Sequence, residues 1–320
     1  MKYNLFLLII TLQIGYASSK DTLQNSKIFE KFHQFAAELD DDCDACGCSA
    51  SGGSMGFASI LNTNFVGIRY FNQAYKSNDG LYSNSPWYAE QFNTTQIWAR
   101  IPLSKKVQFT VVLPYHFHNR ETATGKQNIS GIGDATIIGL YQIYQTKTDS
   151  TYFAHTLQMG LGVKLPLGKF NEGNNGSVNP SYQVGTGSWD YHFVTEYSIR
   201  RKKLGLNTQL NYVVKTANSK NYQFGNQFNY SGTVFYLLEK NDYTIAPQLG
   251  FAGEEYAENR QHNQLLKNTS GNIIMTKLGL EIGKKNLSFG ATAMLPIKQN
   301  LTNGTVEAKY RWSVNVNYAL

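Results

Sequence analysis

Three clustered cysteines are the residues of this sequence best suited to hold a metal ion. Cys43, Cys46 and Cys48 are the chain's three cysteines, and the flanking residues include Asp42 and Asp44. Their spacing lets three thiolates converge on one soft ion, Cu(I) or Zn(II), with a carboxylate as an additional ligand. In an oxidising compartment two of the three would instead form a disulfide and leave one free thiol. Both interpretations remain open from the sequence.

A second set of chemistry-bearing residues lies at alternate positions of segments with mixed polarity. Side chains two residues apart lie on the same side of a β-strand, so we expect them to share a polar face. Seven residues are candidates for lining a polar interior: His116, His118, Asp190, His192, Glu196, Lys309 and Arg311. Their mixed charges favour structural ion pairs between walls. The histidines would either bind an entering metal ion or lie solvated at the mouth of a pore.

The end of the chain indicates which elements position these residues. Apolar residues from Tyr310 to Tyr318 alternate with polar ones, and the polar set includes Arg311 and Asn315. A period of two indicates a β-strand with one apolar and one polar face. Aromatic residues at both ends with valines between them are typical of a strand that crosses a bilayer, which needs roughly 9–11 residues.

The same alternation recurs along the chain and predicts 12 strands. The regular segments are 107–118, 153–167, 189–200, 204–214, 222–238, 243–251, 274–282, 287–297 and 308–320, and the segments near 60–72, 90–103 and 133–145 are less regular. Short connections alternate with long ones rich in Asn, Gly and Ser, such as the expected loop over 119–133. This layout is typical of outer-membrane barrels, which have tight periplasmic turns and long extracellular loops.

We therefore predict an all-β fold, a 12-stranded antiparallel transmembrane β-barrel over residues 59–320. A soluble secreted β-sandwich or barrel is the alternative, since its strands also alternate. Its apolar faces would be aliphatic and point inward, its strands would be short, and its connections would show no alternation in length.

The beginning of the sequence predicts an exported protein. Met1 and Lys2 are followed by a short apolar run and then by small residues, the order of a secretory signal, which we assign to residues 1–19. Residues 20–58 would then form a periplasmic arm, and apolar residues at helical spacing predict an amphipathic helix over residues 26–39 within it. We expect no membrane-spanning helix, and we expect both termini to lie in the periplasm.

The charge of the chain narrows its expected partners. The formal net charge is +7, but the basic residues lie in scattered pairs such as Lys105-Lys106 and Lys284-Lys285 rather than on one helix or arm, so we expect no nucleic-acid partner. The expected partners are the lipid bilayer of the outer membrane, the barrel-assembly machinery, and a small solute or metal ion.

The stretch GIGDATIIGLYQIY, Gly131 to Tyr144, resembles a segment found in a known protein family. It resembles the Gly-x-Gly-Asp segment at the start of a strand in the outer-membrane proteins named for the MetA pathway of phenol degradation. The barrel plan over residues 59–320 is also similar to transporter-type barrels of Bacteroidetes that carry a Cys-rich segment before the first strand. The resemblance implies passage of small molecules or ions across the outer membrane.

These observations predict a channel or transporter for a small solute, linked to copper or zinc handling through the Cys-rich arm. The alternative is an adhesin-like barrel that binds a surface ligand with its loops and transports nothing. We expect no enzyme. A lipid-facing Ser/His pair would indicate a phospholipase, but His155, the strand histidine on an apolar face, has no adjacent serine in its own strand.

Overall fold

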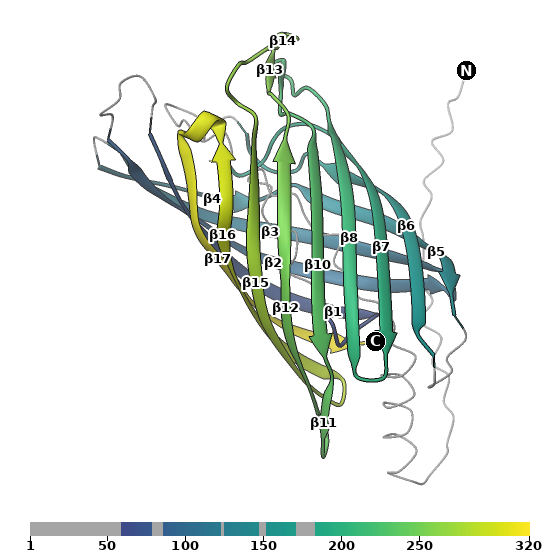
Figure 1. The fold of residues 1–320 in the computed structure, drawn as a ribbon. Helices are drawn as coiled ribbons and strands as arrows, with labels where there is room; N and C mark the ends of the chain where they lie inside the picture. Colours follow the sequence, from purple (N-terminus) through teal and green to yellow (C-terminus); the bar gives the residue numbers. More distant parts are fainter. Residues whose placement is uncertain (1–58, 79–85, 123–124, 147–151, 171–182) are drawn as a thin grey trace, which may run out of the picture.

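The computed structural model describes residues 59–78, 86–122, 125–146, 152–170 and 183–320 (Figure 1). The predicted signal and arm, the helix expected over 26–39 and the three cysteines lie outside the described residues. The described residues form β-strands and one short 3-10 helix, η1 (Thr302–Gly304). No helix in this part of the chain is long and apolar enough to cross a membrane.

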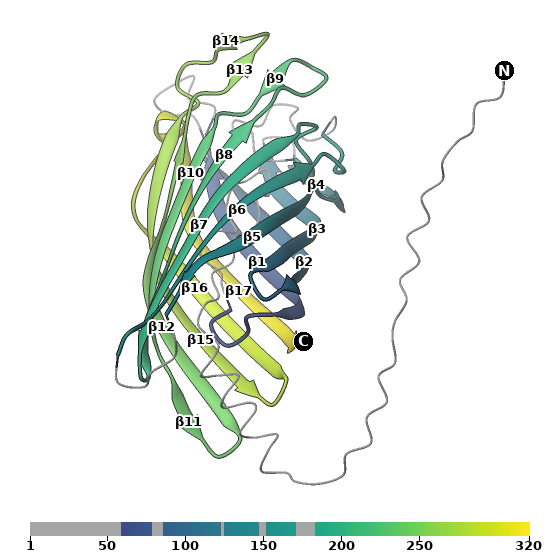
Figure 2. The ribbon, with the colours of Figure 1, turned by 90° about the vertical axis from the view of Figure 1, so that its right-hand side faces the viewer.

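Fourteen of the strands form one antiparallel sheet that closes on itself (Figures 1 and 2). They are β1 (Phe65–Ser77), β2 (Tyr88–Ser104), β3 (Val107–Thr122), β4 (Gly125–Ile132), β5 (Ala135–Gln145), β6 (Ala154–Leu165), β7 (Asp190–Arg201), β8 (Leu204–Lys215), β10 (Gln227–Tyr236), β11 (Leu238–Lys240), β12 (Tyr243–Tyr256), β15 (Gly271–Lys284), β16 (Leu287–Leu301) and β17 (Val306–Ala319).

The closed sheet is a 12-stranded barrel. β4 and β5 both pair with β3, and β10 and β11 both pair with β12, so each of these two pairs is one interrupted barrel strand and the count falls from 14 to 12. β1 pairs with β17 from Phe65 opposite Ala319 to Ser77 opposite Val306, which joins the first strand to the last. The predicted fold class, an all-β 12-stranded antiparallel barrel, is confirmed.

Two expected segments differ from the structure. The prediction of a long loop over 119–133 is wrong, because β4 continues the ladder with β3 as far as Gly125 opposite Thr122. The single strand expected over 222–238 is also wrong: β9 (Tyr222–Gln223) leaves the barrel and pairs with β13 (Arg260–Gln261), which pairs with β14 (Gln264–Leu265).

A side-chain hydrogen bond explains why the backbone leaves the barrel ladder at this point. The Gly225 N–H donates to Asn259 Oδ1 at 2.8 Å, so this backbone group bonds a loop side chain and not a neighbouring strand. Asn259 Nδ2 also donates to the Tyr222 hydroxyl at 2.8 Å. Burial raises the pKa of Tyr222 to about 12, so its hydroxyl stays neutral at physiological pH.

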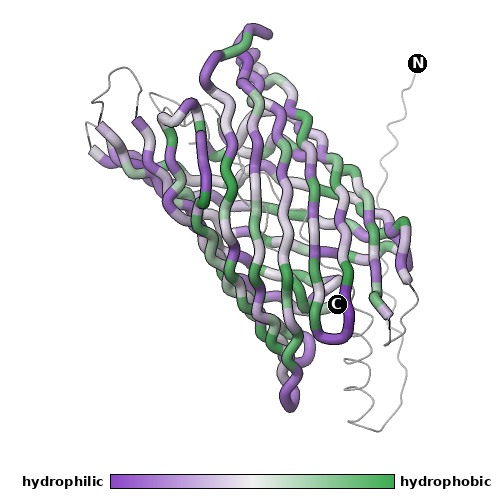
Figure 3. Tube along the Cα trace, in the orientation of Figure 1, coloured by the Kyte–Doolittle hydropathy of each residue, from purple (hydrophilic) through white to green (hydrophobic). Residues whose placement is uncertain are grey.

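The outward face of the barrel is mainly apolar, and most of the polar side chains in its strands face inward. Along β7, Tyr191 and Phe193 are about half exposed, whereas Asp190, His192 and Glu196 are buried. Figure 3 shows hydrophobic and hydrophilic positions alternating along the strands. This is the reverse of a soluble β-sandwich, and it matches a barrel whose outer wall contacts lipid.

Val314 gives a direct test of the outer face. Its side chain is 44% exposed on β17, between the aromatic residues Trp312 and Tyr318. Val314→Arg should lower the free energy of unfolding in lipid vesicles by about 2–4 kcal/mol, because it places a charge near the bilayer midplane. Val314→Leu is the control and should unfold like the wild type in a denaturant titration. Equal stability of the Arg and Leu variants would contradict the assignment of this face to lipid.

Candidate functional site in the barrel interior

The interior of the barrel is crowded with charged side chains of both signs. Among the described residues, seven cationic side chains and six carboxylates are buried: Arg69, Arg100, Arg120, Lys164, Lys215, Lys277 and Arg311 against Glu90, Asp134, Asp190, Glu196, Glu254 and Glu281. The buried charges of this part of the chain therefore nearly cancel. Buried charges are stable only when they are paired and hydrogen-bonded, so the contacts among these groups decide what the interior can do.

One ion pair joins strands that are far apart in the sheet. Arg100 of β2 donates from Nη2 to both carboxylate oxygens of Glu196 on β7, at 3.1 and 3.3 Å, and both side chains are at most 3% exposed. Gln209 of β8 donates to the same carboxylate at 3.1 Å. Since β2 and β7 are separated by three strands of the sheet, this contact reaches across the interior rather than along the wall.

A second cluster centres on Asp134, at the junction of β4 and β5. Its carboxylate accepts hydrogen bonds from the Gly168 N–H, from the Thr186 N–H and from the Thr186 hydroxyl, at 2.9, 2.9 and 2.8 Å. The Lys164 ammonium lies 3.2 Å from Asp134 and 2.6 Å from Asp190. Asp134 therefore holds the two described ends of the β6–β7 connection against the inside of the wall.

A third group of paired charges joins β17 to β12. Arg311 Nη1 lies 2.6 Å from Glu254 Oε1, and Arg311 Nη2 donates to the Tyr75 hydroxyl at 2.6 Å. Tyr256 donates its hydroxyl to the other oxygen of Glu254. The two charged side chains are at most 1% exposed, so this pair also fills the interior.

Glu281 of β15 binds the segment that precedes β1. Its carboxylate accepts the Ser59 hydroxyl at 2.7 Å and the Ile60 N–H at 2.6 Å, and Ser288 donates to it at 2.9 Å. Ile60 packs with an inward-facing cluster formed by Phe235, Leu237 and Ala246. Residues 59–62 therefore lie inside the barrel, near the end where the Leu320 N–H bonds the Asn64 carbonyl.

The predicted pore-lining histidines are buried in two groups. His116 and His118 lie side by side with ring centroids 4.8 Å apart, and His116 Nδ1 lies 2.8 Å from Thr94 Oγ1. His192 instead contacts Asn211, at 3.4 Å. Among the described residues no group of three or more His, Cys, Asp or Glu side chains could hold a metal ion, so the histidines do not form such a site there.

The structure places six of the seven candidates in the interior and one outside it. His116, His118, Asp190, His192, Glu196 and Arg311 are all buried. Lys309 departs from the expected alternation: its side chain is 45% exposed and binds Glu307 at 2.9 Å. The cause is a β-bulge, since Ala74 pairs with Tyr310 and Tyr75 with Ala308, which leaves Lys309 as an extra residue in β17.

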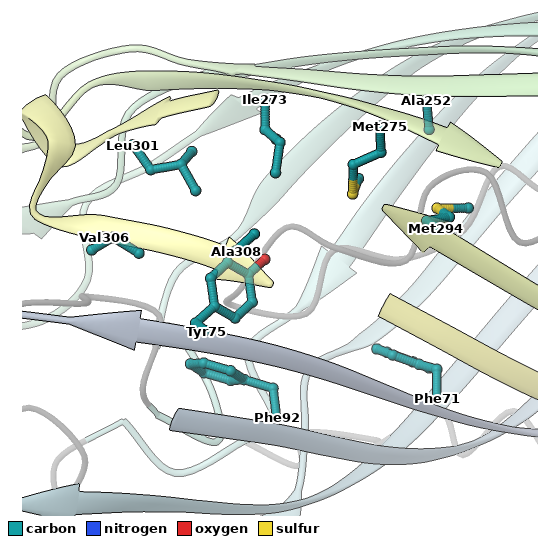
Figure 4. Packing of buried hydrophobic residues seen from close by; sticks show 10 residues of the cluster. All are labelled: Phe71, Tyr75, Phe92, Ala252, Ile273, Met275, Met294, Leu301, Val306 and Ala308. Atoms are coloured by element: carbon teal, nitrogen blue, oxygen red, sulfur yellow. The ribbon is translucent and has the colours of Figure 1, made fainter. Parts of the chain in front are cut away.

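An apolar cluster inside the barrel is the feature that sequence reasoning missed. Figure 4 shows it between β1, β2, β12, β15, β16 and β17. Its members are Phe71, Tyr75, Phe92, Ala252, Ile273, Met275, Met294, Leu301, Val306 and Ala308. These residues occupy inward positions where alternation predicts polar side chains. The inward face of β2 likewise carries Phe92 and Trp98, so alternation did not identify Arg100 as an inward-facing charge. Asp134 could have been identified from the sequence, because it is the aspartate of the Gly-x-Gly-Asp stretch.

Comparisons with known proteins agree with this barrel. The family model described as MetA-pathway of phenol degradation matches residues 87–317. No curated protein matches the chain significantly. Among solved structures, an outer membrane channel from Pseudomonas putida F1 has a TM-score of 0.62 and 10% identity, over 80% of this chain and 95% of that chain. At this identity the likeness shows a shared fold.

Two further solved structures are less similar. The β domain of the Bordetella autotransporter BrkA has a TM-score of 0.48 and 9% identity, over 81% of this chain and 100% of that chain. The NanC porin has a TM-score of 0.42 and 13% identity, over 80% of this chain and 100% of that chain.

The Arg100–Glu196 pair yields a stability prediction. Glu196→Ala should lower the free energy of unfolding by about 3–5 kcal/mol, because it leaves a guanidinium buried without its carboxylate. The double variant Arg100→Met with Glu196→Met should recover most of this loss, since apolar side chains of similar volume often replace a buried ion pair without cost. Denaturant unfolding in vesicles measures both. A double variant less stable than Glu196→Ala would contradict the prediction.

Proposed function

Because the chain belongs to the family described as MetA-pathway of phenol degradation, and because its barrel encloses a polar interior, we propose that it is an outer-membrane channel or transporter for a small solute. The observation that carries this proposal is the inverted polarity of the barrel. An apolar outer wall suits a bilayer, and a hydrogen-bonding inner wall suits a solute that leaves water. We assign no catalytic step to it: His155 Nδ1 contacts the Tyr197 hydroxyl at 2.7 Å, so a tyrosine and not a serine is its partner there.

The channel rests in a closed state. The ion pairs Arg100–Glu196 and Arg311–Glu254 are almost completely buried, and the segment bound by Glu281 occupies one end of the interior. A solute that passes must displace these side chains or the segment. Passage therefore requires a conformational change of the interior. The solute's own polar groups would have to replace the hydrogen bonds that are broken between interior side chains.

The proposed orientation places the termini and the tight turns in the periplasm. The turns after β7, β11 and β15 are two residues long and contain Lys202, Asn241 and Lys285 with positive φ, which closes an antiparallel pair tightly. They lie at the same end as Phe65 and Ala319. The longer connections and the small sheet of β9, β13 and β14 lie at the opposite end, which we assign to the cell exterior (Figure 2).

Conductance in reconstituted bilayers tests the channel. The full chain should show small, intermittent conductance, and the double variant Arg100→Ala with Glu196→Ala should conduct more, because it removes two buried side chains that meet across the interior and leaves the charge balance unchanged. Val314→Leu on the outer wall is the matched control and should behave like the wild type. Absence of any conductance or solute flux in both the wild type and the double variant would overturn the proposal and favour a loop-binding barrel.

We further propose that the Cys-rich arm links this channel to copper or zinc. The spacing of Cys43, Cys46 and Cys48 and the neighbouring aspartates support this. Purified full chain titrated with Cu(I) and with Zn(II) should bind one ion per chain, and a variant with all three cysteines changed to Ser should bind none. A free-thiol count accompanies each titration. Two oxidised cysteines with no bound metal would replace this proposal with a disulfide.

A further inference from the structure

A group of lysines lies on the outer wall of the barrel where the apolar surface ends. On β16 the outward apolar residues end at Ile297, and Lys298 follows as an exposed residue. On β17 they end at Tyr310, next to Lys309. Lys76 of β1 lies opposite Glu307 of β17. We call Lys76, Lys298, Lys309 and Glu307 the lysine rim.

The contacts within the lysine rim leave a surplus of positive charge. Lys76 Nζ and Lys309 Nζ lie 3.0 and 2.9 Å from the same oxygen of Glu307, so two ammonium groups share one carboxylate. Lys298, which is exposed on the neighbouring strand β16, adds a third ammonium group, so the four residues of the lysine rim carry a net charge of +2. The side chains of Lys76 and Lys309 are 31% and 45% exposed, so both ammonium groups are accessible from outside the barrel.

Local structure holds these lysines in place. The bulge in β17 turns Lys309 outward; with regular alternation it would share the inward face of Arg311. The Gln299 side chain accepts from the Ala308 N–H at 2.7 Å and donates to the Ala308 carbonyl at 3.0 Å, which keeps the Lys298 end of β16 beside β17. Lys76 Nζ lies 4.4 Å from the centre of the Trp87 ring. Backbone and aromatic contacts thus position the ammonium groups.

We propose that the lysine rim binds a phosphate group of lipid A, the phosphorylated lipid of the outer leaflet. Ammonium groups just beyond the hydrocarbon-facing wall lie at the level where lipid phosphates begin, and a phosphate carries enough negative charge to match a surplus of two. The acyl chains would run along the exposed apolar strip below, which includes Leu295, Trp312 and Val314. This inference rests on the proposed orientation, in which this end of the barrel faces the cell exterior.

Binding of purified lipid A to the detergent-solubilised full chain tests the inference. The probes are bisphosphorylated and dephosphorylated lipid A, and native mass spectrometry measures the bound fraction across a titration. The wild type should bind the bisphosphorylated form about tenfold more tightly than does the triple variant Lys76→Gln, Lys298→Gln, Lys309→Gln. The two proteins should bind the dephosphorylated form with similar affinity. A gel-mobility comparison of heated and unheated samples checks that each variant forms a barrel.

The matched control removes lysines at the opposite end of the barrel. Lys284 is exposed there, where its Nζ donates to the Tyr243 hydroxyl at 3.0 Å, and Lys285 lies in the following turn. Lys284→Gln with Lys285→Gln should leave lipid A affinity unchanged. Equal affinity of the wild type and the triple variant overturns the lipid site, and loss of affinity in the control variant instead overturns both the site and the orientation.

Conductance of the same preparations separates this inference from the channel proposal. The lysine rim lies on the outer wall, so the triple variant should conduct like the wild type. Unchanged conductance with unchanged lipid affinity would reject the lipid site and leave the channel standing, whereas changed conductance in the triple variant would contradict a site confined to the outer wall.

Discussion

The pairing of β1 with β17 is the interaction on which the rest of the structure depends. A bilayer offers no partners for backbone N–H and C=O groups, so a sheet can cross it only when its first and last strands bond each other. Thirteen residue pairs join these two strands, from Phe65 opposite Ala319 to Ser77 opposite Val306. Closure then sets the polarity of every strand, because one face must meet lipid and the other must fill the space enclosed by 12 strands.

Filling that space with charge constrains how the protein can work. Each buried ion is costly to desolvate, and the structure offsets this with partners drawn from distant strands, as in Arg100 with Glu196 and Arg311 with Glu254. In the proposed channel, the same contacts that stabilise the interior would obstruct a solute. Transport through the proposed channel would therefore be coupled to the exchange of internal hydrogen bonds, and selectivity would depend on which solutes can supply substitutes for them. A wide, water-filled porin has no such requirement.

The sequence predicted those parts of the molecule that follow from strand periodicity. Strand number, antiparallel order and the inward placement of Arg311 all follow from alternation with a period of two. They can be predicted without knowing how the sheet closes. Lys309 was placed on the wrong face because a single bulge residue reverses the alternation, and nothing in the residue types nearby marks the bulge. The partner of Arg100 was also beyond prediction, since Glu196 is 96 residues away and the pair depends on barrel shape.

The Gly-x-Gly-Asp stretch shows how a short motif becomes interpretable once its surroundings are known. A side chain at Gly133 would place its Cβ 2.3 Å from His116 Nε2, so any larger residue here would force the buried His116 side chain or the backbone to shift. That close passage brings Asp134 to a position where it accepts the N–H groups of Gly168 and Thr186, on either side of the β6–β7 connection. Gly133 therefore allows the close approach of the backbone to His116, and Asp134 holds the β6–β7 connection inside the barrel. A role in shaping the interior explains the motif without any chemistry at the carboxylate. In the proposed channel, Asp134 would be among the groups that must move if this connection is displaced.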